Sequence, residues 1–194
     1  MKGGAGQIRA FIAIEIPDPI KTSLQNLQRS LSASGIRASF SRPETLHLTL
    51  KFLGNIRPDQ LAALEKGMEK AVSGIPPHRL CAFGLGVFPS VKHARIIWSG
   101  IRGETHYLQP LGSALESLLF QSPGINKEAK RFTPHLTLAR VKPDTSPDRI
   151  LSAVMTFRDF QTPDFSVSGI SLFQSELSSS GAVHRRIGFT PFQS

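Results

Sequence analysis

The sequence of 194 residues contains a single cysteine, Cys81. One thiol cannot form an intramolecular disulfide, and it cannot build a cysteine-based metal cluster. We therefore interpret Cys81 as a small buried thiol on a strand rather than as a nucleophile. A chain without disulfides suits a reducing compartment such as the cytoplasm.

Long hydrophobic runs are also missing. The apolar stretch 10–14 has five residues and is bracketed by Arg9 and Glu15. Such a stretch is too short for the core of a signal peptide, and no segment approaches the roughly 20 apolar residues that a membrane-spanning helix needs. We therefore expect a cytoplasmic protein without a membrane partner.

Acidic residues are scarce relative to basic ones. The sequence has 14 Asp and Glu against 23 Lys and Arg, which gives a net charge of +9. This balance favours an anionic partner, either nucleic acid or a nucleotide, and less readily a membrane surface. The basic residues are scattered without a dense run, so a generally basic soluble surface is the alternative interpretation.

Hydrophobic periodicity predicts a mixture of strands and helices. Apolar residues alternate with others over 8–16, as in a half-buried strand. Apolar residues at helical spacing, with proline or glycine near the ends, predict helices over 18–33, 58–73, 104–120 and 146–156. Further strands are expected near 36–41, 45–53, 78–87, 94–100, 132–141, 164–174 and 182–190.

This order of elements lacks a regular βαβ alternation. It predicts an α+β protein with mainly antiparallel sheets, and the length suits a single domain over 1–194. Residues 1–6 are expected to form a flexible start, 121–131 a polar and basic loop, and 177–182 an exposed loop between the last two strands.

A short internal repeat is the most informative feature. The segment His47-Leu48-Thr49-Leu50 recurs 88 residues later as His135-Leu136-Thr137-Leu138. Because side chains alternate along a strand, the His and Thr of each copy share one face while the leucines point into a core. Each copy therefore presents an imidazole and a hydroxyl side by side on a rigid strand.

Two such pairs suit the cleavage of a phosphodiester without a metal. The reaction needs a base on the attacking side and an acid on the leaving-group side, and histidine serves either role near neutral pH. The hydroxyls of Thr49 and Thr137 can hydrogen-bond the phosphate oxygens, and a guanidinium can offset their charge. Arg140 lies five residues after His135. Simple alternation places it on the opposite face, so its use in the site requires a bulge or the end of the strand.

Other interpretations of these residues have less support. A single His-x-Thr on a strand is most often a packed histidine, but two copies are less easily a coincidence. No Cys, Asp or Glu stands at ligand spacing beside either copy, and neither a Gly-x-Ser-x-Gly segment nor a phosphate-binding glycine-rich loop is present. Phe11 and Phe52 are candidates for stacking on a nucleobase, with core packing as the alternative. The other histidines are interpreted as surface or structural residues: His78, His93, His106 and His184.

The sequence resembles the RNA 2',3'-cyclic phosphodiesterases, also called 2'-5' RNA ligases, of the two-histidine phosphoesterase superfamily. The resemblance runs along almost the whole chain and rests on the long motifs at 42–54 and 132–141. Supporting segments lie at 9–14, 88–90, 95–98, 173–177 and 181–182. His184 departs from the family, which commonly has a tyrosine or another aromatic residue thereabouts.

The resemblance implies a bilobal fold, in which two mainly antiparallel sheets surround a central cleft, helices lie outside, and a pseudo-twofold axis relates the lobes. It implies hydrolysis of RNA 2',3'-cyclic phosphate ends to 2'-phosphomonoesters without a metal or other cofactor, and reversible 2'-5' ligation as the same chemistry run backwards. On the matching positions, His47 would be the proton donor to the departing O3' and His135 the base that activates water. Thr49, Thr137 and Arg140 would hold the phosphate.

Two alternatives remain open on this reasoning. A related hydrolase would act on another cyclic phosphate, such as a small nucleotide or an ADP-ribose derivative. A non-catalytic RNA-binding module would keep the same fold. We expect a monomer that acts on RNA with a cyclic phosphate terminus, tRNA fragments among them.

Overall fold

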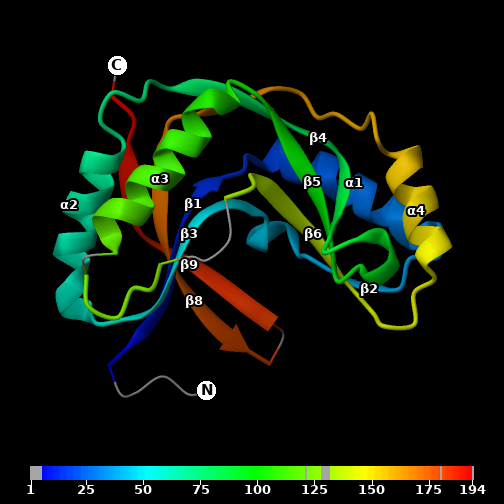
Figure 1. Cartoon of the computed structure of the whole chain (residues 1–194), viewed down its shortest axis with the longest axis horizontal. Coiled ribbons are helices and arrows are strands. Elements are labelled where there is room, and N and C mark those ends of the chain that lie inside the picture. Colours follow the sequence, from blue (N-terminus) through cyan, green and yellow to red (C-terminus); the bar gives the residue numbers. More distant parts are fainter. Residues whose placement is uncertain (1–5, 121, 128–131, 180, 194) are drawn as a thin grey trace.

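A computed structural model describes residues 6–120, 122–127, 132–179 and 181–193 of the chain. Within these residues a curled sheet of nine strands is packed against four α-helices (Figure 1). The strands follow the order β7-β4-β5-β6-β3-β1-β8-β9, and β2 pairs with β6. All of these pairings are antiparallel. The α+β class expected from the order of elements is thus confirmed.

The bounds of the elements are as follows. The strands are β1 (Ile8–Glu15), β2 (Ala38–Phe40), β3 (His47–Ile56), β4 (His78–Phe88), β5 (Ile96–Gly103), β6 (His135–Val141), β7 (Phe165–Val167), β8 (Gly169–Ser178) and β9 (Gly181–Pro191). The α-helices are α1 (Asp18–Ala33), α2 (Leu61–Ala71), α3 (Leu108–Leu119) and α4 (Pro147–Thr156). Short 3-10 turns are η1 (Pro43–Thr45), η2 (Pro58–Gln60), η3 (Val91–His93) and η4 (Thr105–Tyr107).

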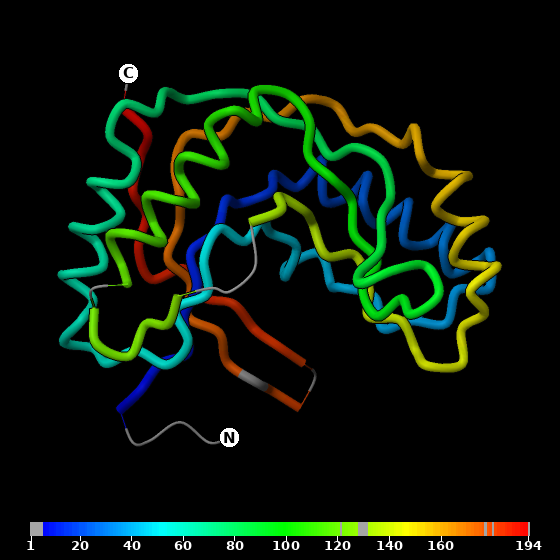
Figure 2. Tube along the Cα trace, in the orientation of Figure 1, coloured from blue at the N-terminus to red at the C-terminus, as the bar shows by residue number. Residues whose placement is uncertain are grey.

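The sheet consists of two halves that meet where β3 pairs with β6, at Leu48 and Leu136. One half contains β1, β3, β8 and β9 and packs against α2 and α3, whereas the other packs against α1 and α4 (Figures 1 and 2). The bilobal arrangement expected from the resemblance is therefore present. The two expected sheets are halves of one continuous sheet, because β3 and β6 form a cross-strand pair.

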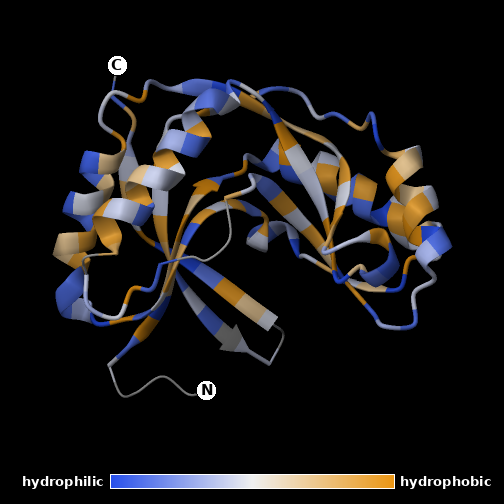
Figure 3. Ribbon diagram, in the orientation of Figure 1, coloured by the Kyte–Doolittle hydropathy of each residue, from blue (hydrophilic) through white to orange (hydrophobic). Residues whose placement is uncertain are grey.

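Each helix packs on the sheet through one apolar side. In α1 the buried leucines Leu24, Leu27 and Leu31 recur at helical spacing, and Pro19 in the first turn suits a helix start because no intrahelical bond needs its missing N–H. In α3 the leucines at 108, 111, 115 and 119 are buried in the same way. Figure 3 shows the resulting alternation of hydrophobic and hydrophilic residues along each helix.

A buried ion pair anchors α3 to β3. The Lys51 side chain is 1% exposed, and its Nζ lies 2.8 Å from a carboxylate oxygen of Glu116 on α3. Lys51 Nζ also donates to the backbone carbonyl of Asn126 at 3.4 Å. A buried ammonium group without a partner would be costly, so these contacts determine how α3 and the segment after it lie against the sheet.

Several expectations for local structure are refined. The helices expected over 58–73 and 104–120 each divide into a 3-10 turn and a shorter α-helix. The loop predicted over 177–182 is longer than the one in the structure, because the pairing of β8 with β9 continues to Ser178 and Gly181. Cys81 is 2% exposed on β4, as expected.

Some expectations fall on parts of the chain that the structure does not describe. The flexible start predicted for 1–6 lies outside the described residues except for Gly6, and the loop predicted over 121–131 is described only at 122–127. None of the described helices has the length and hydrophobicity needed to cross a membrane.

We expect Glu116→Ala to lower the free energy of unfolding by about 3–5 kcal/mol, because the substitution leaves the Lys51 ammonium buried beside a lone carbonyl. Urea unfolding followed by circular dichroism would measure the change. Glu69→Ala is the matched control, since Glu69 is an exposed helical glutamate on α2 and should change stability by less than about 0.5 kcal/mol. Equal effects of the two substitutions would contradict the role given to the ion pair.

Candidate active site

The two repeated motifs begin the two strands at the centre of the sheet. His47 is the first residue of β3 and His135 is the first residue of β6. Continuing the antiparallel register by one residue on either side of the Leu48–Leu136 pair places each motif histidine opposite the threonine of the other motif. The histidines are then diagonal neighbours, about 7–8 Å apart, which leaves room for one phosphate group between the rings.

Both motifs contain the same bulge. On β3 the partners of Ala13 and Ile12 are Thr49 and Lys51, so that Leu50 is the extra residue. On β6 the partners of Trp98 and Ile97 are Thr137 and Ala139, so that Leu138 is the extra residue. A bulge of this kind reverses the alternation of side chains beyond it.

The consequence is visible in the burial of the two strands. From each histidine onward the six residues are half-buried, buried, half-buried, buried, buried and exposed, in the same order on β3 and β6. The sixth positions are Phe52 and Arg140. The bulge therefore returns both to the face of His47, Thr49, His135 and Thr137, which we call the motif face. The structure thus provides the bulge that Arg140 requires to reach this face. The two motifs differ at the sixth position, where β3 carries the ring of Phe52 and β6 carries the guanidinium of Arg140.

Backbone carbonyls orient both imidazoles in the same way. Nδ1 of His47 lies 2.7 Å from the carbonyl oxygen of Thr45, and Nδ1 of His135 lies 2.6 Å from that of Thr133. A carbonyl can only accept a hydrogen bond, so each Nδ1 carries the proton and donates it. Nε2 of each ring is therefore the nitrogen left available for proton exchange.

Aromatic side chains surround His47 on its own half of the sheet. Its ring stacks on Phe11 with centroids 4.6 Å apart, and Phe173 stacks on Phe11 at 5.2 Å. The ring of His184 from β9 stands at 90° to that of His47 at 5.2 Å. Phe11 is 3% exposed. The expectation that Phe11 stacks on a nucleobase is therefore wrong, because other rings already cover it, and its place is under His47.

Phe52 differs from Phe11 in its exposure. Its side chain is 56% exposed on the motif face, 6.2 Å from the ring of Phe11. A nucleobase can reach a ring in this position, so the expectation of stacking stays a prediction for Phe52.

The surroundings of His135 are different from those of His47. Phe88 meets the His135 ring edge-on at 5.1 Å, and Trp98 lies 6.1 Å away. The indole of Trp98 in turn lies over Gly86, where a Cβ atom would overlap it. Two copies of one motif are thus held by unlike neighbours, although their backbones are alike.

The surroundings of His47 also change its electrostatics. Burial, and after it the charges of His184 and His135, lower the pKa of His47 from its ordinary value of 6.5 to about 4, against the opposing effect of the Thr45 carbonyl. Burial, and then the charge of Arg42, also lower the pKa of His184. His47 is therefore neutral near pH 7 when no anion is bound.

Sequence reasoning missed two residues beside His47. His184 was interpreted as surface or structural, yet it lies against the His47 ring. Arg42, five residues before His47, donates a hydrogen bond to the carbonyl oxygen of Ala182 at 2.5 Å and thereby ties the start of the motif to β9. Neither contact has a local signal in the sequence, because each joins residues about 140 positions apart. The remaining histidines lie elsewhere: His78 packs against Tyr107 and Phe192, and His93 and His106 are exposed on 3-10 turns.

The arrangement matches a known family. A model of LigT-like phosphoesterases matches residues 14–98 and 106–184, two segments that each contain one motif. The chain belongs to the LigT-like phosphoesterase family. Among the described residues, no group of three or more His, Cys, Asp or Glu side chains is arranged to hold a metal ion.

Relatives in this family are similar over nearly their whole length. The RNA 2',3'-cyclic phosphodiesterase of Methanothermobacter thermautotrophicus is 28% identical over 92% of this chain and 95% of its own. That of Aquifex aeolicus is 28% identical over 91% and 93%. Among solved structures, a protein of Thermus thermophilus matches with a TM-score of 0.77 at 24% identity over 95% of this chain and 98% of its own. Escherichia coli LigT complexed with 3'-AMP matches with a TM-score of 0.74 at 19% identity over 97% and 99%. These structures confirm the fold.

We expect acidification to destabilise the protein through His47. Between pH 6.5 and about pH 4 the unfolded chain takes up a proton on this residue while the folded chain does not. The contribution of neutral His47 to the free energy of unfolding is fully present above pH 6.5. It falls by about 1–3 kcal/mol as the pH drops toward 4. Urea unfolding across this range should show a smaller loss for His47→Gln than for the unaltered protein. The same loss in both would contradict the depressed pKa.

Proposed function

We propose that the protein hydrolyses RNA 2',3'-cyclic phosphate ends to 2'-phosphomonoesters, with His47 and His135 as the proton-transferring groups. The observation that carries the proposal is the diagonal pair of imidazoles, each held by a backbone carbonyl so that Nε2 is available. Membership in the LigT-like family supports it. So do the relatives named RNA 2',3'-cyclic phosphodiesterases.

In this mechanism the phosphate lies between the two rings. Nε2 of His135 removes a proton from water as the water oxygen forms a bond to phosphorus. The bond from phosphorus to O3' breaks on the opposite side, and Nε2 of protonated His47 donates a proton to the departing oxygen. Atoms balance with one water consumed, and proton exchange with solvent restores both rings.

The low pKa of His47 links protonation to substrate binding. A neutral His47 cannot act as an acid, but a phosphodiester anion within about 4–6 Å favours the imidazolium and raises the pKa. His47 would therefore gain its catalytic proton with the substrate rather than before it.

The remaining predicted residues would bind the substrate. Thr49 and Thr137 flank the histidines on the motif face and would donate hydrogen bonds to the non-bridging oxygens. Arg140 would contribute charge on the His135 side, and Phe52 would stack on a base. The net charge of +9 favours an RNA strand as the larger part of the substrate.

The proposal extends to the protein's setting. Reversible 2'-5' ligation would follow from the same transfers, with a 5'-hydroxyl attacking phosphorus in place of water and O3' departing; attack by the 3'-hydroxyl on the 2'-5' bond would reverse it. We further infer a single-domain monomer over 1–194 that acts in the cytoplasm without a metal or other cofactor. The single cysteine supports the cytoplasmic setting.

We expect His47→Asn and His135→Asn each to reduce kcat by about 10²–10⁴-fold on an oligonucleotide ending in a 2',3'-cyclic phosphate, because each removes one proton transfer. The exposed His106 on η4 supplies the control, and His106→Asn should retain full activity. Activity should also persist in EDTA. Unchanged turnover in either motif variant would refute the proposal, and strong inhibition by EDTA would refute its metal-independent form.

A further inference from the structure

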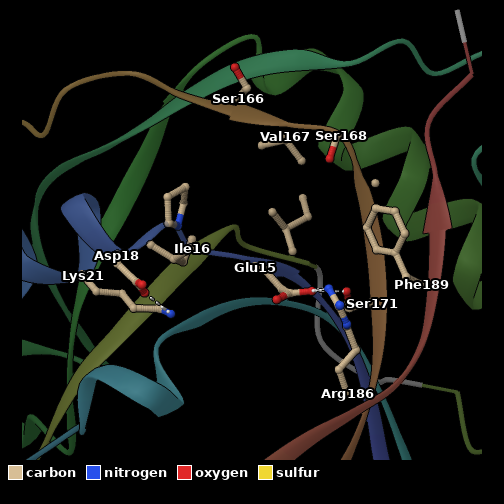
Figure 4. A pocket seen from close by; sticks show the side chains of 13 residues that line it. Glu15, Ile16, Asp18, Lys21, Ser166, Val167, Ser168, Ser171, Arg186 and Phe189 are labelled. Atoms are coloured by element: carbon tan, nitrogen blue, oxygen red, sulfur yellow. Dashed lines mark hydrogen bonds and ion pairs between the residues drawn. The ribbon is translucent and has the colours of Figure 1, made fainter.

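A cavity separate from the paired histidines lies against β1, β8 and β9 (Figure 4). Its volume is about 390 Å³, which lies within the range of small-molecule sites. We call it the Glu15 pocket. Side chains from the end of β1, the start of α1, the β7–β8 segment and β9 line it, among them Glu15, Lys21, Ser166, Ser168, Arg186 and Phe189.

Strand register places this pocket next to the motif face. Glu15 is the direct partner of His47 between β1 and β3, so their side chains lie on the same face. Ser171 pairs with Ala13 across β1 and with Phe189 across β9. The pocket therefore adjoins His47 on the side away from His135.

The charged groups of the pocket neutralise one another. Arg186 donates to Glu15 Oε1 at 2.8 Å, and Ser171 donates to the same oxygen at 2.5 Å. Lys21 Nζ lies 3.0 Å from Asp18. Burial tends to raise the pKa of Glu15, but the bonds from Ser171 and Arg186 outweigh it and leave the pKa below its usual value. A phosphate would meet a carboxylate here, so the pocket is poorly suited to an anion.

An uncharged, flat and polar ligand fits these groups better. The Phe189 ring is 48% exposed at the rim of the pocket, with the Arg186 guanidinium 5.7 Å from its centroid. The hydroxyls of Ser166 and Ser168 and the ionised carboxylate of Glu15 provide hydrogen-bonding groups around it (Figure 4). A stacking ring beside such groups is the arrangement that recognises a nucleobase.

In-line displacement relates this pocket to the reaction. Water attacks from the His135 side, so the departing O3' and its ribose lie on the His47 side, where the Glu15 pocket is. We propose that the Glu15 pocket binds the base of the nucleoside that carries the cyclic phosphate, with Phe189 as the stacking ring. This inference rests on the proposed function and names the part of the substrate that the second site takes.

Two substrates and two phenylalanines test the inference. A nucleoside 2',3'-cyclic phosphate carries the base, whereas 1-O-methylribose 2',3'-cyclic phosphate lacks it. Phe189→Ala should raise KM for the nucleotide by about 5–100-fold with little change in kcat, since stacking on an aromatic ring is worth about 1–3 kcal/mol. It should leave the kinetics of the base-free compound unchanged. Phe120→Ala is the matched control, because Phe120 is similarly exposed at 53% but follows α3 rather than lining the pocket.

A second variant covers the case in which Phe189→Ala fails to fold. Ser168→Phe adds a ring at an exposed position that borders the cavity, and it should raise KM for the nucleotide alone. The inference is overturned if the unaltered protein uses both compounds equally well, or if either variant affects both compounds to the same extent. Hydrolysis of an oligonucleotide ending in a 2',3'-cyclic phosphate, but of neither small compound, would also overturn the inference. Failure of the unaltered protein to hydrolyse that oligonucleotide would instead overturn the proposed function.

Discussion

The pairing of Leu48 with Leu136 is the constraint on which the site depends. Both leucines are fully buried, and they join the two halves of the sheet at the strands that carry the motifs. Because each motif histidine immediately precedes one of these leucines, the same packing that joins the lobes sets the separation of His47 and His135. The proposed substrate contacts thereby lie on strands backed by buried leucines rather than on loops, which favours precise geometry.

The two motifs share their backbone features but lie in unlike environments, and this difference sets the properties of His47. The bulges after Thr49 and Thr137 and the carbonyls that fix Nδ1 are the same in both lobes. The His47 ring is enclosed by aromatic groups and by His184, so its pKa falls to about 4. Burial thus keeps His47 neutral until an anion arrives, and the proposed acid is charged mainly in the complex.

The part of the site that sequence reasoning predicted well was the part with a local signal. The repeat located both histidines and threonines on strands, and the α+β class followed from the order of elements. The bulge that turns Arg140 to the motif face has no such signal, because simple alternation predicts the opposite face. For Phe11 the sequence leaves stacking on a base and core packing as alternatives, and only the folded structure shows the ring buried under His47. The contacts of Arg42 and His184 were missed because β9 reaches the first motif only in the folded sheet.

The most direct test of the central claim is the identity of the product formed in ¹⁸O-labelled water. An oligonucleotide ending in a 2',3'-cyclic phosphate would be treated with the protein, and the product analysed by mass spectrometry and ³¹P NMR. The account predicts a 2'-phosphate that carries one ¹⁸O atom beside a free 3'-hydroxyl, since His135 activates water and His47 protonates O3'. A 3'-phosphate product would contradict this placement of acid and base.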